Sequence, residues 1–163
     1  MMIQIGILIA ISLLMLAAVG DVALRIVPNW LSVAVATDGI VLRTVYGNLP
    51  VAAAAALAVF VPAALCWRRG LMGGGDVKLL AAASLLVAPS LVPRLLLLVA
   101  LAGGLLGLVY YAMRLVLRAP SRIRSRLLVV RILRIEQHRI SRGFSLPYAS
   151  AIALGCVYCL LKG

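Results

Sequence analysis

Long apolar runs separated by short polar segments make up most of this chain. Six runs can be marked, at about residues 2–20, 30–46, 50–67, 77–92, 94–113 and 147–161. Apolar positions within them are continuous rather than alternating, which favours membrane-spanning helices over the strands of a barrel. Some runs are shorter than the roughly twenty residues that cross a bilayer, so helix tilt or local thinning is expected. The pattern predicts an all-α polytopic membrane protein with six transmembrane helices.

The composition excludes a water-soluble domain. Apolar residues make up 65% of the chain and charged residues 12%, and the mean hydropathy is +1.17, whereas a soluble domain is about half apolar and a quarter charged. Residues 1–20 lack the basic start and the small-residue cleavage site of a signal peptide, so we expect a permanent first span there. We interpret residues 1–163 as one transmembrane domain with a basic cytoplasmic loop at about 114–145.

The distribution of basic residues predicts the orientation in the membrane. Lys and Arg number 16 against four acids, for a net charge of +12, and nine arginines lie within residues 114–142. Because positively charged loops stay in the cytoplasm, this segment is expected inside and the N-terminus outside. No soluble module is present to bind nucleic acid, so topology and anionic lipid headgroups account for the charge.

Two of the four acids are expected to lie at the same membrane face. Asp21 follows the first apolar run and Asp76 precedes the fourth, so alternating spans bring both to the cytoplasmic side. Alone, Asp21 reads most simply as an ion-pair partner of Arg25 one helical turn away. Asp76 alone reads as the N-cap of a helix that starts in a glycine-rich turn, where the helix dipole favours a carboxylate.

Together, the two carboxylates point to catalysis. Acids brought close share a proton, so that one ionised group can activate water while the neutral one protonates an oxygen. Three glycines before Asp76 disfavour a helix there and leave backbone N–H groups open to an extended peptide. Of the other acids, Asp38 lies near the middle of the second run, with an undecided role, and Glu136 is a solvated ion-pair partner.

No metal or cofactor is predicted. His138 is the single histidine and has no nucleophile placed near it. Cys156 and Cys159 form a CxxC pattern inside an apolar run, without the second pair that a zinc site needs. We therefore interpret these two cysteines and Cys66 as small packing residues.

Three segments resemble a known family. Gly73-x-Gly75-Asp76 is similar to the GxGD motif of intramembrane aspartyl proteases, and residues 73–78 together resemble the signature of the short, CpaA/TadV-type prepilin peptidases. Residues 21–29 resemble that family's first-aspartate region, and Leu146-Pro147-Tyr148 resembles the start of its last span. Positions that match the family outside the two aspartates are Gly73, Gly74, Gly75, Lys78, Arg25, Pro28 and Asn29.

The resemblance implies an aspartic endopeptidase of the bacterial inner membrane that cleaves the leader from type IV (Flp/Tad-type) prepilins at the cytoplasmic face. It implies catalysis by Asp21 and Asp76, with the other matching residues supporting the acids or the substrate. The four-cysteine region of larger, bifunctional members is absent, so proteolysis without N-methylation is implied. Two alternatives from other classes stay open: a non-catalytic membrane component of a pilus or secretion machine, and a small ion-coupled transporter.

Overall fold

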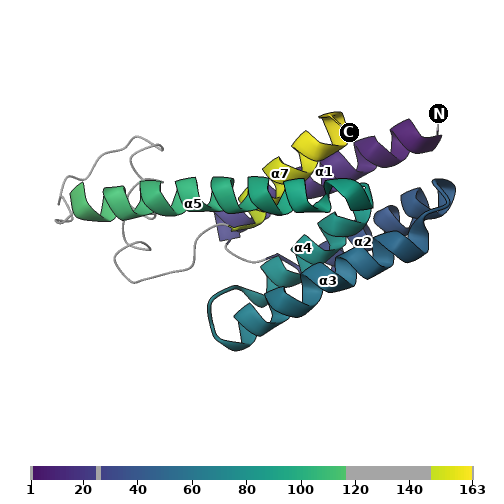
Figure 1. Cartoon of the computed structure of the whole chain (residues 1–163). Helices are drawn as coiled ribbons and strands as arrows, with labels where there is room; N and C mark the ends of the chain where they lie inside the picture. Colours follow the sequence, from purple (N-terminus) through teal and green to yellow (C-terminus); the bar gives the residue numbers. More distant parts are fainter. Residues whose placement is uncertain (1, 25–26, 117–147, 163) are drawn as a thin grey trace. The chain divides into compact units, whose positions relative to one another are not determined.

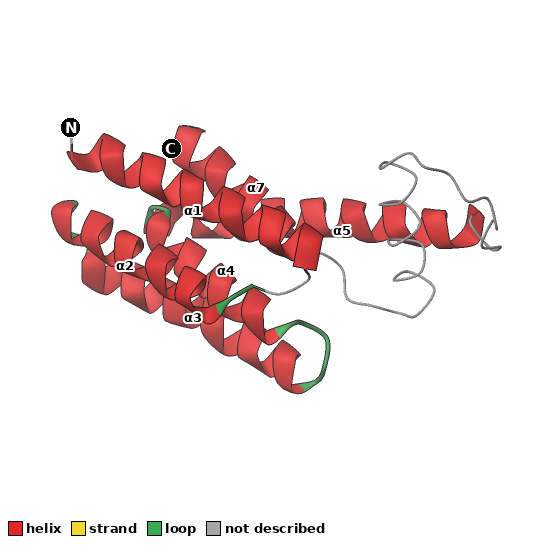
Figure 2. Cartoon of the chain, turned by 180° about the vertical axis from the view of Figure 1, so that it is seen from behind, coloured by secondary structure: helices red, strands yellow, loops and turns green. Residues whose placement is uncertain are grey.

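A computed structural model describes residues 2–24, 27–116 and 148–162, and helices account for nearly all of them. No strand occurs within these ranges (Figure 2). The helices are α1 (Met2–Leu24), α2 (Asn29–Val45), α3 (Leu49–Arg68), α4 (Gly74–Leu86), the short 3-10 helix η1 (Pro89–Leu91), α5 (Val92–Val116) and α7 (Tyr148–Lys162). Each of the six predicted apolar runs contains one α-helix, which confirms the all-α class.

Three of these segments are long and apolar enough to cross a membrane: Ile3–Ala23, Leu49–Arg68 and Pro89–Ala112. Helix α7 is apolar but shorter, and α2 and α4 contain 17 and 13 residues. Many large apolar side chains remain exposed along the long helices, among them Leu8, Leu57 and Leu101. Such a surface is stable in lipid and costly in water. The structure supports a membrane-embedded helical protein, and the count of six spans stays a prediction.

The chain divides into two compact units. One contains residues 1–102 and 147–163, and the other contains residues 103–146. The described part of the second unit is the C-terminal portion of α5, Gly103–Val116. The predicted basic loop, with Glu136 and His138, lies outside the described residues, as do Arg25 and Pro147.

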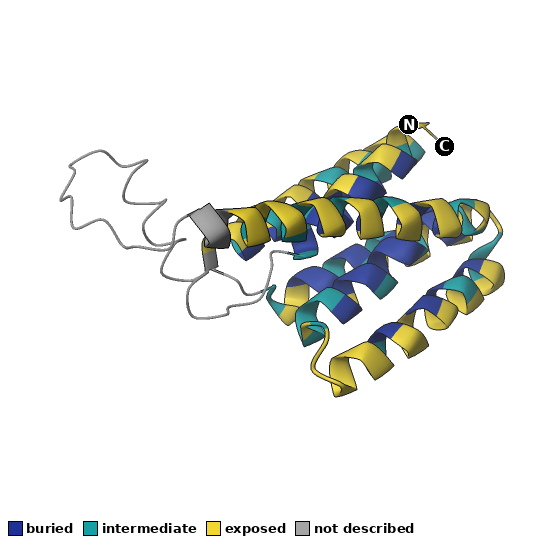
Figure 3. Cartoon of the chain, turned by 60° about the vertical axis from the view of Figure 1, so that its left-hand side comes forward, coloured by how far each residue is buried: buried dark blue, intermediate teal, exposed yellow. Residues whose placement is uncertain are grey.

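Helix α4 is the centre of the first unit. It packs against α2, α3 and α7, while α1 packs against α2 and α7 (Figure 1). Seven of its 13 residues are buried, and Figure 3 shows buried positions gathered on the inner helices while α3 and α5 keep exposed outer faces. Three successive alanines, Ala81 to Ala83, lie between two pairs of leucines in α4, and such small side chains let neighbouring helices approach closely.

Helices α2 and α4 run parallel and touch at a glycine. A Cβ at Gly39 would lie 2.8 Å from the Cβ of Leu85 and 3.1 Å from its backbone carbon, so only glycine fits. Beyond this contact, the buried Arg43 Nη2 donates a hydrogen bond of 2.6 Å to the carbonyl of Leu86, at the C-terminal end of α4. The partial negative charge at the C-terminal end of α4 also stabilises the Arg43 cation. These contacts hold the C-terminal half of α2 against the C-terminal end of α4.

The ends of two helices differ from the prediction. Helix α1 continues to Leu24, so Asp21 lies within its last turn rather than after it. The second apolar run is predicted to begin at about residue 30, whereas α2 begins at Asn29, with Pro28 at the N-cap (φ −65°, ψ 141°). Helix α4 starts at Gly74, directly after an extended Gly73, as the glycine run predicted. The shifts are small, and the Asn29 side chain makes a contact with another helix.

Candidate active site

Asp21 joins α1 to the start of α7. Its side chain is 5% exposed, and Oδ2 accepts a hydrogen bond of 2.9 Å from the backbone N–H of Ala149. Ala149 lies in the first turn of α7, where N–H groups have no partner inside the helix. The carboxylate therefore satisfies an otherwise unpaired donor and holds the two helix ends together. The predicted pairing of Asp21 with Arg25 cannot be followed, because Arg25 is outside the described residues.

Asp76 lies in the first turn of α4 and folds back onto the glycine run. Its carboxylate makes a hydrogen bond with the backbone of Gly73, and a Cβ at Gly73 would lie only 2.8 Å from Oδ2. A Cβ at Gly75 would lie 3.3 Å from the Cβ of Val27. The absence of side chains at both glycines thus makes room for the carboxylate on one side and for the segment before α2 on the other.

The two acids interact electrostatically. The pKa of Asp76 is raised to about 7, first by burial and second by the charge of Asp21, while the hydrogen bond at Gly73 acts in the opposite direction. Asp76 lies outside the three candidate spans, at the end of the bundle that also holds Asp21 and Ala149. The helix N-terminus was expected to stabilise the charged form of Asp76, but burial and the charge of Asp21 outweigh that effect. At neutral pH the site can therefore hold one neutral and one ionised carboxyl.

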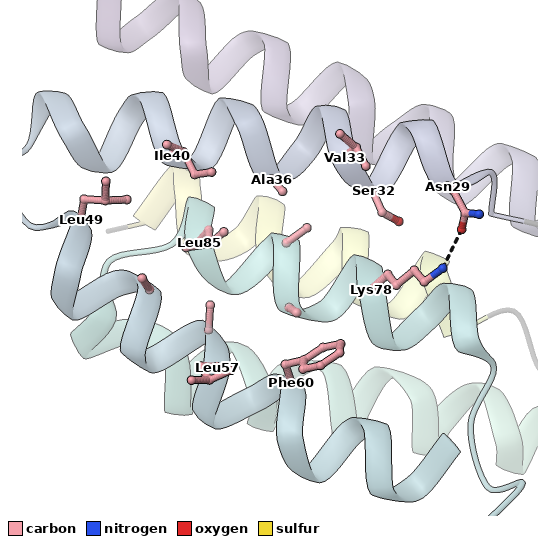
Figure 4. Close-up of a pocket in the computed structure, with 14 residues that line it drawn as sticks. Asn29, Ser32, Val33, Ala36, Ile40, Leu49, Leu57, Phe60, Lys78 and Leu85 are labelled. Atoms are coloured by element: carbon pink, nitrogen blue, oxygen red, sulfur yellow. Dashed lines mark hydrogen bonds between the residues drawn. The ribbon is translucent and has the colours of Figure 1, made fainter. Parts of the chain in front are cut away.

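A polar contact beside the acids connects α2 with α4. Lys78 Nζ donates a hydrogen bond of 3.0 Å to Asn29 Oδ1 (Figure 4). Lys78 follows Asp76 by two residues, so the contact holds the start of α2 next to the first turn of α4. Gly74 packs close to the indole of Trp67, with 3.1 Å from its would-be Cβ to Nε1. The structure thus brings together the predicted residues of 73–78 with Pro28 and Asn29.

Ala149 is the residue of this site that sequence reasoning missed. Its contribution is a backbone N–H, which no side-chain pattern reveals. The available signal was its position, directly after the Leu146-Pro147-Tyr148 motif at the start of the last apolar run. The first backbone N–H groups of a helix have no partner within the helix, so the start of the last apolar run could have been expected to donate to a nearby carboxylate.

Asp38 is separate from this site. It lies nine residues along α2 from Asn29, and its buried Oδ2 has no hydrogen-bond partner among the described residues. The small pocket that it lines, of about 230 Å³ between α1 and α2, is otherwise formed by apolar residues and Gly6. Neither Asp21 nor Asp76 lines that pocket.

The cysteines and the remaining acids form no metal site in the part of the chain that the structure describes. Cys156 and Cys159 are buried, and Cys156 Sγ lies 3.7 Å from the carbonyl oxygen of Ala83 in α4. Both are packing residues, as predicted. Cys66 differs, because its side chain is exposed near the end of α3.

Comparison with known proteins identifies the family. Neither the curated proteins nor the solved structures contained a significant match to this chain. The family model Peptidase_A24, described as the type IV leader peptidase family, matches residues 8–108. That range covers more than half of the chain and includes both Asp21 and Asp76. The chain therefore belongs to the type IV leader peptidase family.

Proposed function

We propose that this protein is an aspartic endopeptidase that removes the leader peptide from type IV prepilins, of the Flp/Tad type, with Asp21 and Asp76 as its catalytic pair. The observation that carries the proposal is the electrostatic interaction between the buried Asp21 and the partly buried Asp76 at one end of the helical bundle. Family membership supports the leader-peptidase activity. The aspartic mechanism is argued from the chemistry of the pair.

In this mechanism the two acids have different tasks. Asp21, which accepts the N–H of Ala149, takes a proton from a water molecule as the water oxygen attacks the scissile carbonyl carbon. Asp76, whose pKa of about 7 keeps part of its population protonated at neutral pH, donates its proton to the carbonyl oxygen. As the tetrahedral intermediate collapses, the C–N bond breaks and Asp21 passes its proton to the departing amine nitrogen. One hydroxyl of the intermediate returns its proton to Asp76 as the product carboxyl forms. The pair then returns to its starting state with one proton.

The neighbouring residues shape and position this pair. Gly73 makes room for the Asp76 carboxylate, and Gly75 makes room for Val27 in the segment before α2. Lys78 and Asn29 hold α2 next to the acid through their hydrogen bond. Because the predicted basic loop is cytoplasmic, this end of the bundle faces the cytoplasm of a bacterial inner membrane in our proposal. We propose proteolysis alone, without methylation of the new N-terminus.

The rate of cleavage is expected to fall as the pH rises through about 7. The pKa of Asp76 is raised to about 7, so above that pH its proton is lost and the pair lacks its acid. Strong acidification protonates the second carboxylate as well, so a plot of kcat/KM against pH is bell-shaped. The measurement is kcat/KM for a prepilin over a pH series that brackets 7, with Asp38→Asn as the control that keeps the same profile. An activity that keeps rising well above pH 7 would contradict the assignment of Asp76.

The proposal is tested by co-expression with prepilin precursors. The wild-type protein is expected to convert a precursor to its mature size, with the cut confirmed by N-terminal sequencing of the product. Cells that lack the protein should retain the precursor. If the protein inserts into the membrane but processes none of several prepilins, the result contradicts the proposal and supports a non-catalytic assembly component instead. Chelator-sensitive cleavage would also contradict the mechanism, since it uses no metal.

A further inference from the structure

A groove runs along the membrane helices and ends beside the candidate active site. It has a volume of about 780 Å³. Helix α4 forms its floor, and α2 and α3, which barely contact each other, form its walls (Figure 4). The lining residues are Asn29, Ser32, Val33, Ala36, Ile40, Leu49, Ala53, Ala56, Leu57, Phe60, Lys78, Ala81, Ala82 and Leu85.

The groove has the length and lining of a helix-docking surface. From Asn29 to Ile40 on α2 it extends roughly 16 Å, or about three helical turns. Alanines supply five of its positions, and small residues let helix backbones approach closely inside a membrane. Val33 and Leu57 are each 61% exposed there. An apolar surface of this size lacks a partner among the described residues and offers contact to an apolar helix.

One end of the groove is polar, and Lys78 at that end follows Asp76 by two residues on α4. All three polar lining residues, Asn29, Ser32 and Lys78, lie there. The Ser32 side chain is 5% exposed, and its hydroxyl has no hydrogen-bond partner among the described residues. A peptide that leaves a helix next to this hydroxyl offers it a backbone carbonyl as acceptor. A lipid acyl chain offers none.

We infer that this groove docks the apolar transmembrane helix of the protein substrate and delivers the residues at the cytoplasmic end of that helix to Asp21 and Asp76. The inference rests on the proposed function and adds the surface that selects the substrate. It makes the groove a determinant of KM, because the docking contacts are the same before and during the chemical step. It also places the scissile bond where the substrate helix ends, beside Lys78 and Asn29.

Photo-crosslinking tests the docking without requiring cleavage. A photoreactive amino acid is placed at Leu57, in the groove, or at Val51, which is 60% exposed on the same helix but outside the groove. Each protein is illuminated in membranes with a tagged prepilin. We expect an adduct from position 57, mapped to the prepilin's apolar segment, and little from position 51. Equal adducts from both positions, or adducts to lipid alone, would overturn the inference.

A matched pair of substitutions on α3 tests the consequence for catalysis. Ala53 is exposed and lines the groove, whereas its neighbour Ala54 is exposed and does not. Ala53→Trp is expected to raise the KM for a membrane-embedded prepilin about tenfold or more, equivalent to about 1.4 kcal/mol of binding, with kcat retained. Ala54→Trp should leave both unchanged. Equal KM values in the two variants would contradict groove docking.

The outcomes separate this inference from the proposed function. If wild-type protein cleaves prepilin but Leu57 forms no adduct and Ala53→Trp behaves like Ala54→Trp, the groove is not the docking site and the peptidase assignment stands. If wild-type protein cleaves no prepilin but position 57 still forms the specific adduct, docking stands and the enzymatic proposal fails. Absence of both results overturns both.

Discussion

Asp76→Asn is expected to abolish prepilin cleavage, with a loss of roughly a thousandfold or more in rate. The asparagine keeps the size of the side chain and its contact with Gly73 but cannot donate a carboxylic proton to the substrate carbonyl. General acid–base groups contribute about 10²–10⁴-fold. Asp21→Asn should have an equally severe effect, because it removes the base. The measurement is the fraction of precursor converted at matched protein levels in the membrane.

Asp38→Asn is the control for both variants. Asp38 is another acid on these helices, but it lines a separate pocket, so its amide is expected to preserve cleavage. Cleavage by the Asp21→Asn protein would contradict the assignment of Asp21 to the catalytic pair. If, in addition, the Asp38→Asn protein were inactive, Asp38 would replace Asp21 as the first catalytic acid. Membrane insertion of all three must match the wild type for the comparison to count.

Gly73→Ala is expected to lower cleavage about a hundredfold while leaving the fold intact. The backbone of Gly73, with φ −69° and ψ 141°, is allowed for any residue, so alanine causes no backbone strain. Its Cβ, however, would lie 2.8 Å from Asp76 Oδ2 and must displace the carboxylate. A misplacement of about 1 Å at a reacting group can cost about a hundredfold in rate.

The matched control for Gly73→Ala is Gly104→Ala. A Cβ at Gly104 meets nothing within 4 Å, so this variant should cleave prepilin like the wild type. The measurements are kcat for both variants and their thermal stability in detergent. A fully active Gly73→Ala protein would show that the position of the Asp76 carboxylate does not limit the rate. A Gly73→Ala protein that unfolds early would attribute the loss to stability.

The proposed function requires the two acids to lie where water and a leader peptide can both reach them. Asp21 lies in the last turn of α1 and Asp76 in the first turn of α4, whereas the groove along α2, α3 and α4 is mostly apolar. The Asp21 carboxylate meets the start of α7, and the Asp76 carboxylate folds against Gly73. Burial and the charge of Asp21 raise the pKa of Asp76 to about 7, which is the range that suits the acid of the proposed catalytic pair.

Local patterns in the sequence were enough to determine the helical class, the six apolar segments and the break before α4. A long apolar run must satisfy its backbone internally, whatever its neighbours are. Three successive glycines disfavour a helix by their own conformational entropy. The alternation of the apolar segments also placed Asp21 and Asp76 at the same end, and their electrostatic contact in the structure agrees with that placement.

Only the tertiary structure decided how the site works. The hydrogen bond from Ala149 to Asp21, the acceptor role of Asn29 toward Lys78, and the groove above α4 each join helices that are distant in the sequence. The protonation of Asp76 was decided in the same way: from sequence, its position at a helix start favoured the charged form, but burial and the charge of Asp21 favour the neutral one. Burial and distances between side chains depend on which helices pack together, and no pattern along a single helix contains that information.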